Sequence, residues 1–211
     1  MDLTDHRQSY EKHTLPDTGM PTTPFELFRT WFDEAVAEAL PEPYAMSLAT
    51  CGADGRPSVR IVLMRELTDR GVVFYTNYDS AKGQDIADNP NAEVLFFWQG
   101  LERQVRLSGR IEKVSADKSA AYFAKRPRES QLGAWVSEPQ SGVVANRAII
   151  EEKYAILDAT YSDAVPYPSF WGGYELIVDC AEFWQGRVGR MHDRMRYTAD
   201  GDVWRIERLL P

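Results

Sequence analysis

Between Ala45 and Glu112 the sequence is divided into short runs rich in Val, Ile, Leu and Phe, with turn residues between them. The separators are Ala53-Asp54-Gly55, Asp69-Arg70-Gly71 and Gln99-Gly100, and each can join neighbouring antiparallel strands. This spacing predicts strands near residues 45–50, 58–66, 72–76, 92–98 and 104–112. Because a meandering sheet of this kind usually closes into a barrel or a sandwich, the pattern favours a mainly β architecture.

Helix signals surround and interrupt this β pattern. Thr23 as N-cap, Pro24 at the first helical position and Glu26 three residues after the cap form a capping box. Ser80, Ser115 and Asn146 are N-cap candidates for further helices, expected over 81–88, up to Lys125, and from residue 146 onward. Strands are expected again at 173–178, 182–185, 191–197 and 203–208, with Asp200-Gly201 as a hairpin turn. The fold class is therefore α+β, mainly β, with a single domain over residues 23–211.

Composition and punctuation limit the classes of function. A formal net charge of −8 over 211 residues gives no general footprint for nucleic acid or for an anionic membrane. The two cysteines and three histidines lack metal-ligand spacing, so we expect no metal site. Residues 1–22 are polar and contain Pro16, Gly19 and Pro21, which is typical of a mobile tail. The chain shows neither a signal peptide nor an apolar membrane span, so we expect a cytoplasmic protein.

One group of cations lies in the segment RMHDR. Arg190, His192 and Arg194 are two residues apart, so an extended chain would project all three side chains from one face. Neighbouring cations are costly unless solvent or an anion separates them. The pattern therefore predicts either an anion site or a solvated edge strand.

A second group of cations precedes a possible helix start. Tyr122 and Arg126 are four residues apart and share a helical face, while Ser130 follows Pro127, where a new helix can begin. A guanidinium, a hydroxyl and free helix amides together suit a phosphate dianion. The alternative is a helix end whose basic residues only complement the helix dipole.

A third group surrounds the apolar run 61–64. Arg60 and Arg65 flank this run at a separation that puts them on opposite faces of an ideal strand, so the strand must twist or bulge if both reach one ligand. Lys82, in the first turn of the helix capped by Ser80, adds a cation where helix amides are free. The segments FFW (96–98), SFWGG (169–173) and EFWQG (182–186) can supply a flat wall for a ring system or simply fill the core.

Seven motifs taken together resemble the pyridoxamine 5′-phosphate oxidase family. In chain order they are RIVLMR (60–65), FYTN (74–77), LERQVR (101–106), RPRESQLGAW (126–135), SFWGG, EFWQG and RMHDR. The resemblance implies an antiparallel FMN-binding split β-barrel with peripheral helices, and a homodimer with FMN at the subunit interface. It also implies oxidation of pyridoxamine or pyridoxine 5′-phosphate to pyridoxal 5′-phosphate, with O2 as electron acceptor and H2O2 as product.

The same resemblance implies which residues bind. The implied FMN contacts are Arg60, Ile61, Val62, Leu63, Met64, Arg65, Tyr75, Thr76, Lys82, Gln104, Gln140, Ser141, Trp184 and Arg194. The implied substrate contacts are Arg65, Tyr122, Arg126, Ser130, Arg190, Met191, His192, Arg7 and Tyr10. Among them Arg190 and His192 are the implied catalytic residues, and His192 either orients the substrate or acts as a general base. Arg7 and Tyr10 resemble tail residues that close over the active site.

The chain departs from the family's usual pattern at three places. Arg65 stands where the family usually has Lys, and Arg keeps the charge but is bulkier. Ala81 stands where many members have Arg, which removes one cation for the FMN phosphate. The segment SEPQS, which contains Gln140 and Ser141, carries an extra residue. Two other functions stay open: another split-barrel flavoenzyme such as a flavin reductase, and a carrier that binds pyridoxal phosphate without turnover.

Overall fold

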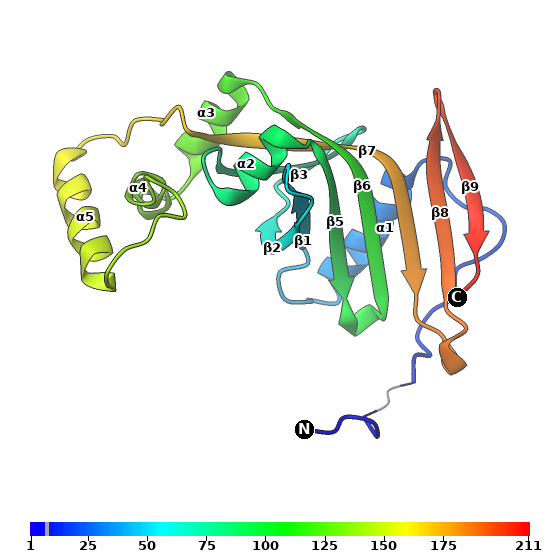
Figure 1. Ribbon diagram of the computed structural model, residues 1–211. Coiled ribbons are helices and arrows are strands. Elements are labelled where there is room, and N and C mark those ends of the chain that lie inside the picture. The colour runs from blue at the N-terminus through cyan, green and yellow to red at the C-terminus, as the bar shows by residue number, and fades with distance from the viewer. Residues whose placement is uncertain (7–8) are drawn as a thin grey trace.

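The computed structural model describes residues 1–6 and 9–211. Within these residues the strands form one nine-stranded antiparallel sheet in the order β2-β1-β5-β6-β7-β4-β3, with β8 added to β7 and β9 to β8. The predicted antiparallel sheet is confirmed, and it curls into an open half-barrel (Figure 1). The strands are β1 (Ala45–Cys51), β2 (Pro57–Leu63), β3 (Glu66–Leu67), β4 (Gly71–Asn77), β5 (Asn91–Trp98), β6 (Arg103–Lys113), β7 (Trp171–Gln185), β8 (Asp193–Asp200) and β9 (Val203–Leu209).

The helices begin where the capping signals predict. Thr23, Ser80, Ser115 and Asn146 each accept a hydrogen bond on the side chain from a backbone N–H of the first helical turn. These bonds satisfy donors that have no partner inside a helix, so the N-terminal boundaries are fixed locally. The helices are α1 (Pro24–Ala37), α2 (Ala81–Asp88), α3 (Ala116–Lys125), α4 (Arg128–Val136) and α5 (Arg147–Thr160).

The main hydrophobic core lies between α1 and the sheet. Phe28 is fully buried, and its ring centroid lies 4.9 Å from that of Phe96 on β5. Trp31 is 3% exposed and lies edge-on to Phe183 on β7, with 5.3 Å between the ring centroids. Burial of each such side chain stabilises the fold by about 1.5–3 kcal/mol, so α1 holds the sheet in its curled shape.

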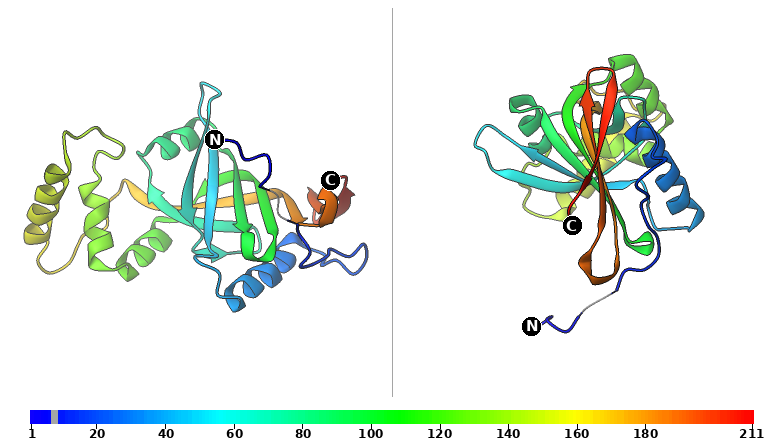
Figure 2. Two further views of the ribbon diagram at one scale, coloured as in Figure 1. Left: turned by 90° about the horizontal axis from the view of Figure 1, so that it is seen from below. Right: turned by 90° about the vertical axis from the view of Figure 1, so that its right-hand side faces the viewer.

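A smaller cluster holds α3 and α4 at the other end of the molecule. Phe123, Leu132 and Trp171 form its buried centre. By contrast, α5 buries none of its residues. Helices α4 and α5 project from the sheet on the side opposite to the β8–β9 hairpin and the C-terminus (Figures 1 and 2).

Two predicted strand boundaries are wrong because pairing partners far along the chain decide them. The expected strand 58–66 ends at Leu63, since Met64 N–H donates to the carbonyl of Tyr44 and Arg65 N–H to that of Val73. The expected strands 173–178 and 182–185 are one continuous strand, β7, which pairs with β6 along nearly its whole length. A register shift between Ser108 and Gly109 absorbs the irregularity there.

The strand expected at residues 191–197 is present but begins later, and the extended chain that would project Arg190, His192 and Arg194 from one face is not found. Residues 188–190 form a short 3-10 turn, in which Gly189 (φ 67°) and Arg190 (φ 63°) adopt left-handed backbone conformations. Strand β8 therefore begins only at Asp193. Arg190 is the last residue of the turn, His192 lies between the turn and β8, and of the three cations only Arg194 is in the strand.

Part of the N-terminal segment packs against the sheet. Leu15 is 6% exposed, and its backbone N–H donates to the carboxylate of Asp193 at 3.1 Å. The hydroxyl of Tyr197 donates to the carbonyl of Pro21. No helix in the described part of the chain is both long and apolar enough to cross a membrane.

Candidate functional site

A cleft of about 320 Å³ lies between β2, β4 and α3, and we call it the cation cleft. Residues from five segments of the chain line it: Ile61, Val62, Leu63, Arg65, Tyr75, Thr76, Lys82, Tyr122, Arg126 and Trp171. All of these except Trp171 are residues that the sequence predicts to contact FMN or the substrate. The fold therefore gathers one large part of the predicted site into a single depression.

One wall of the cation cleft is a stack of three aromatic rings. The rings of Tyr75 and Tyr122 lie 3.9 Å apart between centroids with planes 14° apart, and the planes of Tyr122 and Trp171 differ by 2°. Burial, together with the charge of Glu66, raises the pKa of Tyr75 to about 12, so this phenol stays neutral. A flat, neutral wall of this kind suits a planar ring.

The charged part of the cation cleft lacks counterions. Arg65, Lys82 and Arg126 form no salt bridge with any described residue. The guanidinium of Arg126 lies 4.6 Å from the ring centroid of Trp171, and its buried Nη1 has no hydrogen-bond partner among the described residues. A buried donor left unpaired costs about 1–3 kcal/mol. An anion bound in the cleft would remove this cost.

Burial and repulsion by neighbouring cations both act on Lys82 and Arg126. The pKa of Lys82 is lowered by its burial and then by the charge of Arg60. The pKa of Arg126 is lowered mainly by burial, and also by the charge of Arg65. The ammonium of Lys82 donates to the hydroxyls of Thr76 (2.9 Å) and Ser80 (3.0 Å), which fixes its position.

Arg60 and Met64 do not line the cation cleft. Arg60 donates to the hydroxyls of Thr50 and Ser58, both at 2.6 Å, and lies 3.7 Å from the carboxylate of Asp85. Met64 is 7% exposed and faces a different depression, between β3 and α1. An ideal strand would place Arg60 and Arg65 on opposite faces. Strand β2 ends at Leu63, and of the two arginines only Arg65 lines the cation cleft.

A second cleft, of about 780 Å³, lies at the turn between β7 and β8, and we call it the histidine cleft. It is lined by His6, Ser9, Tyr10, Arg187, Gly189, Arg190 and His192. The ring of His192 lies 4.6 Å from that of Trp184, and Tyr10 lies edge-on to Trp184 at 5.8 Å. Strand pairing also places Gln104, Trp184 and Arg194 side by side on β6, β7 and β8.

The tautomer of His192 follows from its hydrogen bond. The backbone N–H of Arg187 donates to Nδ1 of His192 at 3.1 Å, so the neutral ring carries its proton on Nε2. Partial burial lowers the pKa of His192, and the charge of Arg190 lowers it further. The imidazole is therefore neutral near pH 7 and presents an N–H donor at Nε2.

Several predicted residues lie outside both clefts. Ser130 is in the first turn of α4, and Gln140 and Ser141 are in the loop between α4 and α5. Met191 is 70% exposed next to the histidine cleft. Arg7 lies outside the described residues. Sequence reasoning also missed five lining residues as contacts. The motif SFWGG marked Trp171 of the cation cleft only as a possible wall, and nothing marked the other four, which line the histidine cleft: His6, Ser9, Arg187 and Gly189.

The two clefts share no lining residue. Strand β7 contributes Trp171 to the cation cleft, and Trp184 lies thirteen residues later beside His192. At about 3.3 Å per residue this is roughly 43 Å along the strand. The two clefts of one chain therefore lie near opposite ends of β7.

Two family models match the chain. Residues 32–157 match the model described as "Pyridoxamine 5'-phosphate oxidase". Residues 171–211 match the model described as "Pyridoxine 5'-phosphate oxidase C-terminal dimerisation region". Strand β7, the turn that carries Arg190 and His192, and the β8–β9 hairpin all lie in the second match.

Similar proteins extend over the full chain. A pyridoxine/pyridoxamine 5′-phosphate oxidase of Psychrobacter arcticus is 62% identical, covering 100% of this chain and 99% of its own length. One from Bordetella petrii is 51% identical, covering 100% of both chains. Both matches extend over the whole chain and so span all the segments that hold the motifs.

Solved structures confirm the split-barrel fold. The crystal structure of PhzG from Burkholderia lata 383, in complex with tetrahydrophenazine-1-carboxylic acid, has a TM-score of 0.87 at 30% identity and covers 92% of this chain and 95% of that chain. A pyridoxamine 5′-phosphate oxidase-related, FMN binding protein from Nostoc punctiforme has a TM-score of 0.72 at 17% identity, covering 91% and 100%. At that identity the second likeness shows the fold alone.

Proposed function

Since the chain belongs to the pyridoxamine 5′-phosphate oxidase family, we propose that it binds FMN and oxidises pyridoxamine or pyridoxine 5′-phosphate to pyridoxal 5′-phosphate, with O2 as acceptor and H2O2 as product. The observation that carries this proposal is the lining of the cation cleft. Three cations without counterions lie beside three stacked rings. Both FMN and the substrate combine a phosphate dianion with a flat ring. The cations of the lining can bind the phosphate, and the aromatic rings can pack against the flat ring.

The residues of the cation cleft fit these two phosphates. Segment 61–65, Tyr75, Thr76 and Lys82 would hold FMN, while Arg65, Tyr122 and Arg126 would hold the substrate phosphate. The unpartnered Nη1 of Arg126 is the donor that a phosphate oxygen would satisfy. When bound, FMN supplies an electron acceptor, which none of these side chains offers. The protein's own work is to bind both phosphates and exclude water.

His192 orients the substrate in this proposal. Because its Nδ1 accepts the N–H of Arg187, the neutral ring offers a donor at Nε2 and no free lone pair there. A general base at Nε2 would need the opposite tautomer and the loss of that hydrogen bond. The exposed guanidinium of Arg190 next to it supplies a second donor group for the reacting part of the substrate.

A complete site takes one cleft from each of two chains. Residues 171–211 match a dimerisation region, and these residues carry the histidine cleft. In a dimer with two-fold symmetry, the cation cleft of one protomer faces the histidine cleft of its partner, and this occurs twice. The separation of the two clefts within one chain supports this arrangement.

The assay that tests the proposal compares several substrates on one preparation. The purified protein should be yellow, release FMN on denaturation, and form H2O2 when pyridoxamine 5′-phosphate is added. A flavin reductase would instead consume a reduced nicotinamide without that substrate, and a carrier would bind pyridoxal phosphate without forming peroxide. Tetrahydrophenazine-1-carboxylic acid, the ligand in the PhzG structure, is assayed as a further substrate to test whether this chain acts on a compound of that kind. Failure to form peroxide from either vitamin phosphate would overturn the proposal.

The shared site has its own test. Arg126→Ala weakens the cation cleft and Arg190→Ala the histidine cleft, so activity is measured with substrate well below KM. Mixed dimers contain one site with both changes and one site with neither. Random exchange of subunits should restore about a quarter of wild-type activity. If both arginines of a site came from the same chain, the mixture would stay as inactive as the two variants alone.

A further inference from the structure

Glu102 is a nearly buried glutamate in a strained backbone conformation. It follows the 3-10 turn Gln99–Leu101 with φ 55° and ψ 38°, the left-handed region that favours glycine. Only 9% of the residue is exposed, although its side chain ends in a carboxyl group. A buried polar group on a strained backbone needs a compensating interaction.

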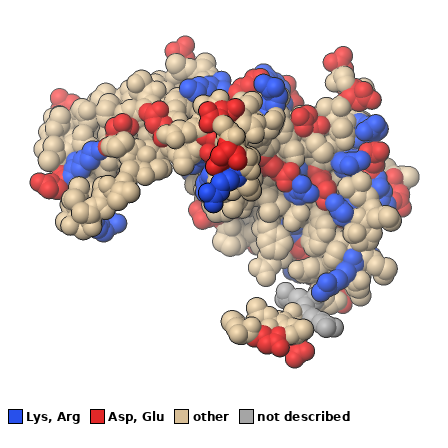
Figure 3. Space-filling view, in the orientation of Figure 1, with Lys and Arg blue, Asp and Glu red and all other residues tan. Residues whose placement is uncertain are grey.

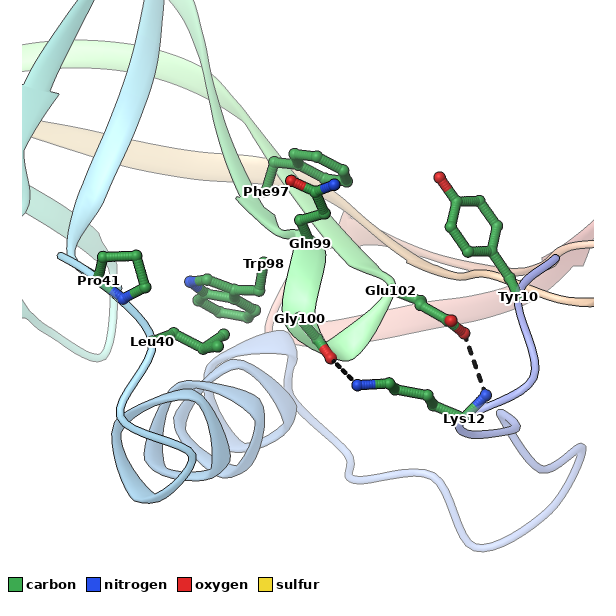
Figure 4. A pocket seen from close by; sticks show the side chains of 9 residues that line it. All are labelled: Tyr10, Lys12, Leu40, Pro41, Phe97, Trp98, Gln99, Gly100 and Glu102. Atoms are coloured by element: carbon green, nitrogen blue, oxygen red, sulfur yellow. Dashed lines mark hydrogen bonds between the residues drawn. The ribbon is translucent and has the colours of Figure 1, made fainter. Parts of the chain in front are cut away.

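The compensating interaction comes from the N-terminal segment. Oε2 of Glu102 accepts hydrogen bonds from the backbone N–H groups of Glu11 (2.8 Å) and Lys12 (3.0 Å). The ammonium of Lys12 donates to the carbonyl of Gly100 at 2.6 Å, so both ends of this residue are held (Figure 4). Because the carboxylate binds backbone N–H groups, it fixes the path of the backbone at residues 11–12 and does not depend on which side chains stand there.

Gly186 forms the other side of the same contact. A Cβ atom at Gly186 would lie 2.8 Å from both Cβ and Cγ of Tyr10, closer than real side chains approach. The backbone N–H of Gly186 donates to the carbonyl of Glu102 at 2.8 Å, which links the two features directly. Because Gly186 has no side chain, it leaves a notch in the surface, and Tyr10 occupies this notch.

The contact fixes Tyr10 in the histidine cleft. The ring of Tyr10 lies 6.1 Å from that of His192 and edge-on to Trp184. Farther along the segment, the backbone N–H of Leu15 donates to Asp193 in the first position of β8. Anchors at residues 11, 12 and 15 thus follow Tyr10 directly and restrict where its ring can lie.

We propose that Glu102 and Gly186 are positioning residues: they dock residues 10–15 and thereby hold Tyr10 over His192 on the substrate side of the site. The consequence for turnover rests on the proposed function, whereas the docking itself does not. Neither residue touches the substrate in this proposal, and both act through Tyr10.

The first experiment measures docking without any substrate. Glu102→Gly removes the carboxylate and relieves the left-handed backbone, so any loss is not due to strain. Gly186→Ala fills the notch. Trypsin cleavage after Lys12, followed by mass spectrometry, should accelerate about tenfold in both variants, which corresponds to about 1.4 kcal/mol of docking. Glu42→Gly is the matched control, because Glu42 also has a positive φ (42°), is exposed, and has a carboxylate without a hydrogen bond in the described part of the chain.

The second experiment measures the consequence for catalysis. With FMN saturating, kcat/KM for pyridoxine 5′-phosphate should fall about tenfold in Glu102→Gly, mainly through KM, while the FMN dissociation constant stays unchanged. Glu102→Gln keeps an acceptor oxygen and should recover part of the loss. In a Tyr10→Ala background, Glu102→Gly should cost almost nothing more, since a positioning residue has no effect without the residue it positions.

The outcomes separate the two proposals. Unchanged cleavage after Lys12 in both variants overturns the docking. Faster cleavage with unchanged kcat/KM, or full additivity with Tyr10→Ala, overturns the positioning role. A wild-type protein without turnover refutes the proposed function and leaves the cleavage experiment to decide the docking alone.

Discussion

The cation cleft and the histidine cleft differ in how their charges are balanced. In the cation cleft, Arg65, Lys82 and Arg126 have no acidic partner among the described residues, and the lining contains no Asp or Glu. In the histidine cleft, Arg187 pairs with Asp193, and beside it Arg194 forms two hydrogen bonds to Glu182 (2.9 and 3.0 Å). Only Arg190, which is exposed, has no acidic partner there among the described residues.

This difference teaches which cleft is built for a strong anion. An arginine already paired with a carboxylate has little attraction left for a phosphate, whereas unpaired and partly buried cations gain most from one. Over much of the face in Figure 3, Lys and Arg lie beside Asp and Glu, so balanced charge is common on this molecule. The cation cleft is a local exception in a chain of net charge −8.

The largest effect is expected from removing the unpartnered guanidinium. Arg126→Ala should raise KM for pyridoxine 5′-phosphate roughly 100-fold with a much smaller change in kcat, because hydrogen bonds to charged groups are worth about 1.5–3 kcal/mol each. Steady-state kinetics with peroxide detection measures this. Arg128→Ala, two residues away and paired with Asp158, is the control and should change KM little. A pure kcat defect in Arg126→Ala would break the assignment of the cleft to phosphate.

A smaller effect is expected from removing Arg190 in the histidine cleft. Arg190→Ala should lower kcat/KM about tenfold, equivalent to about 1.4 kcal/mol of transition-state binding. Arg205→Ala on β9 removes an exposed arginine of the same hairpin region and serves as the control. An unaltered kcat/KM in Arg190→Ala would mean that the histidine cleft does not face the substrate.

A third prediction concerns Lys82 and the affinity of the cation cleft for FMN. Lys82→Gln should weaken FMN binding about fivefold, or about 1 kcal/mol, because solvent screens a partly exposed ion pair. Flavin fluorescence quenching on reconstitution gives the dissociation constant. Lys113→Gln is matched in charge and lies over Tyr78 instead of the cation cleft, so FMN affinity there should be unchanged.

The smallest effect concerns His192 and is visible mainly in the pH profile. The pKa of His192 lies below its usual value of 6.5, so the ring is neutral at pH 7 and gains a proton only as the pH falls through that lowered pKa. Protonation places a hydrogen on Nδ1 and breaks the bond from Arg187, so kcat/KM should fall at acid pH. His192→Asn should cost about threefold at pH 7, as expected for a neutral hydrogen bond of about 0.5–1.5 kcal/mol. The acid limb should be lost in that variant; if it persists unchanged, another group controls it.

The helix starts and most strands were predictable because their signals are local. The capping box at Thr23 needs only residues 23–26, and the composition of each apolar run predicts a strand there. The continuous strand β7 was not predictable, because polar residues near Asp179 indicate a break and only pairing with β6 carries the strand through. The same holds for the end of β2, which depends on acceptors at Tyr44 and Val73.

The sequence by itself determined the class of sheet, the helix starts and the list of residues able to bind a phosphate. The tertiary structure decided how that list divides into two clefts, which arginines are neutralised, and that Arg190 lies in a left-handed turn instead of a strand. The physical reason is the range of the interactions. Caps and periodic burial act over a few residues, whereas charge balance and cleft geometry depend on side chains that the folded chain brings together from distant segments.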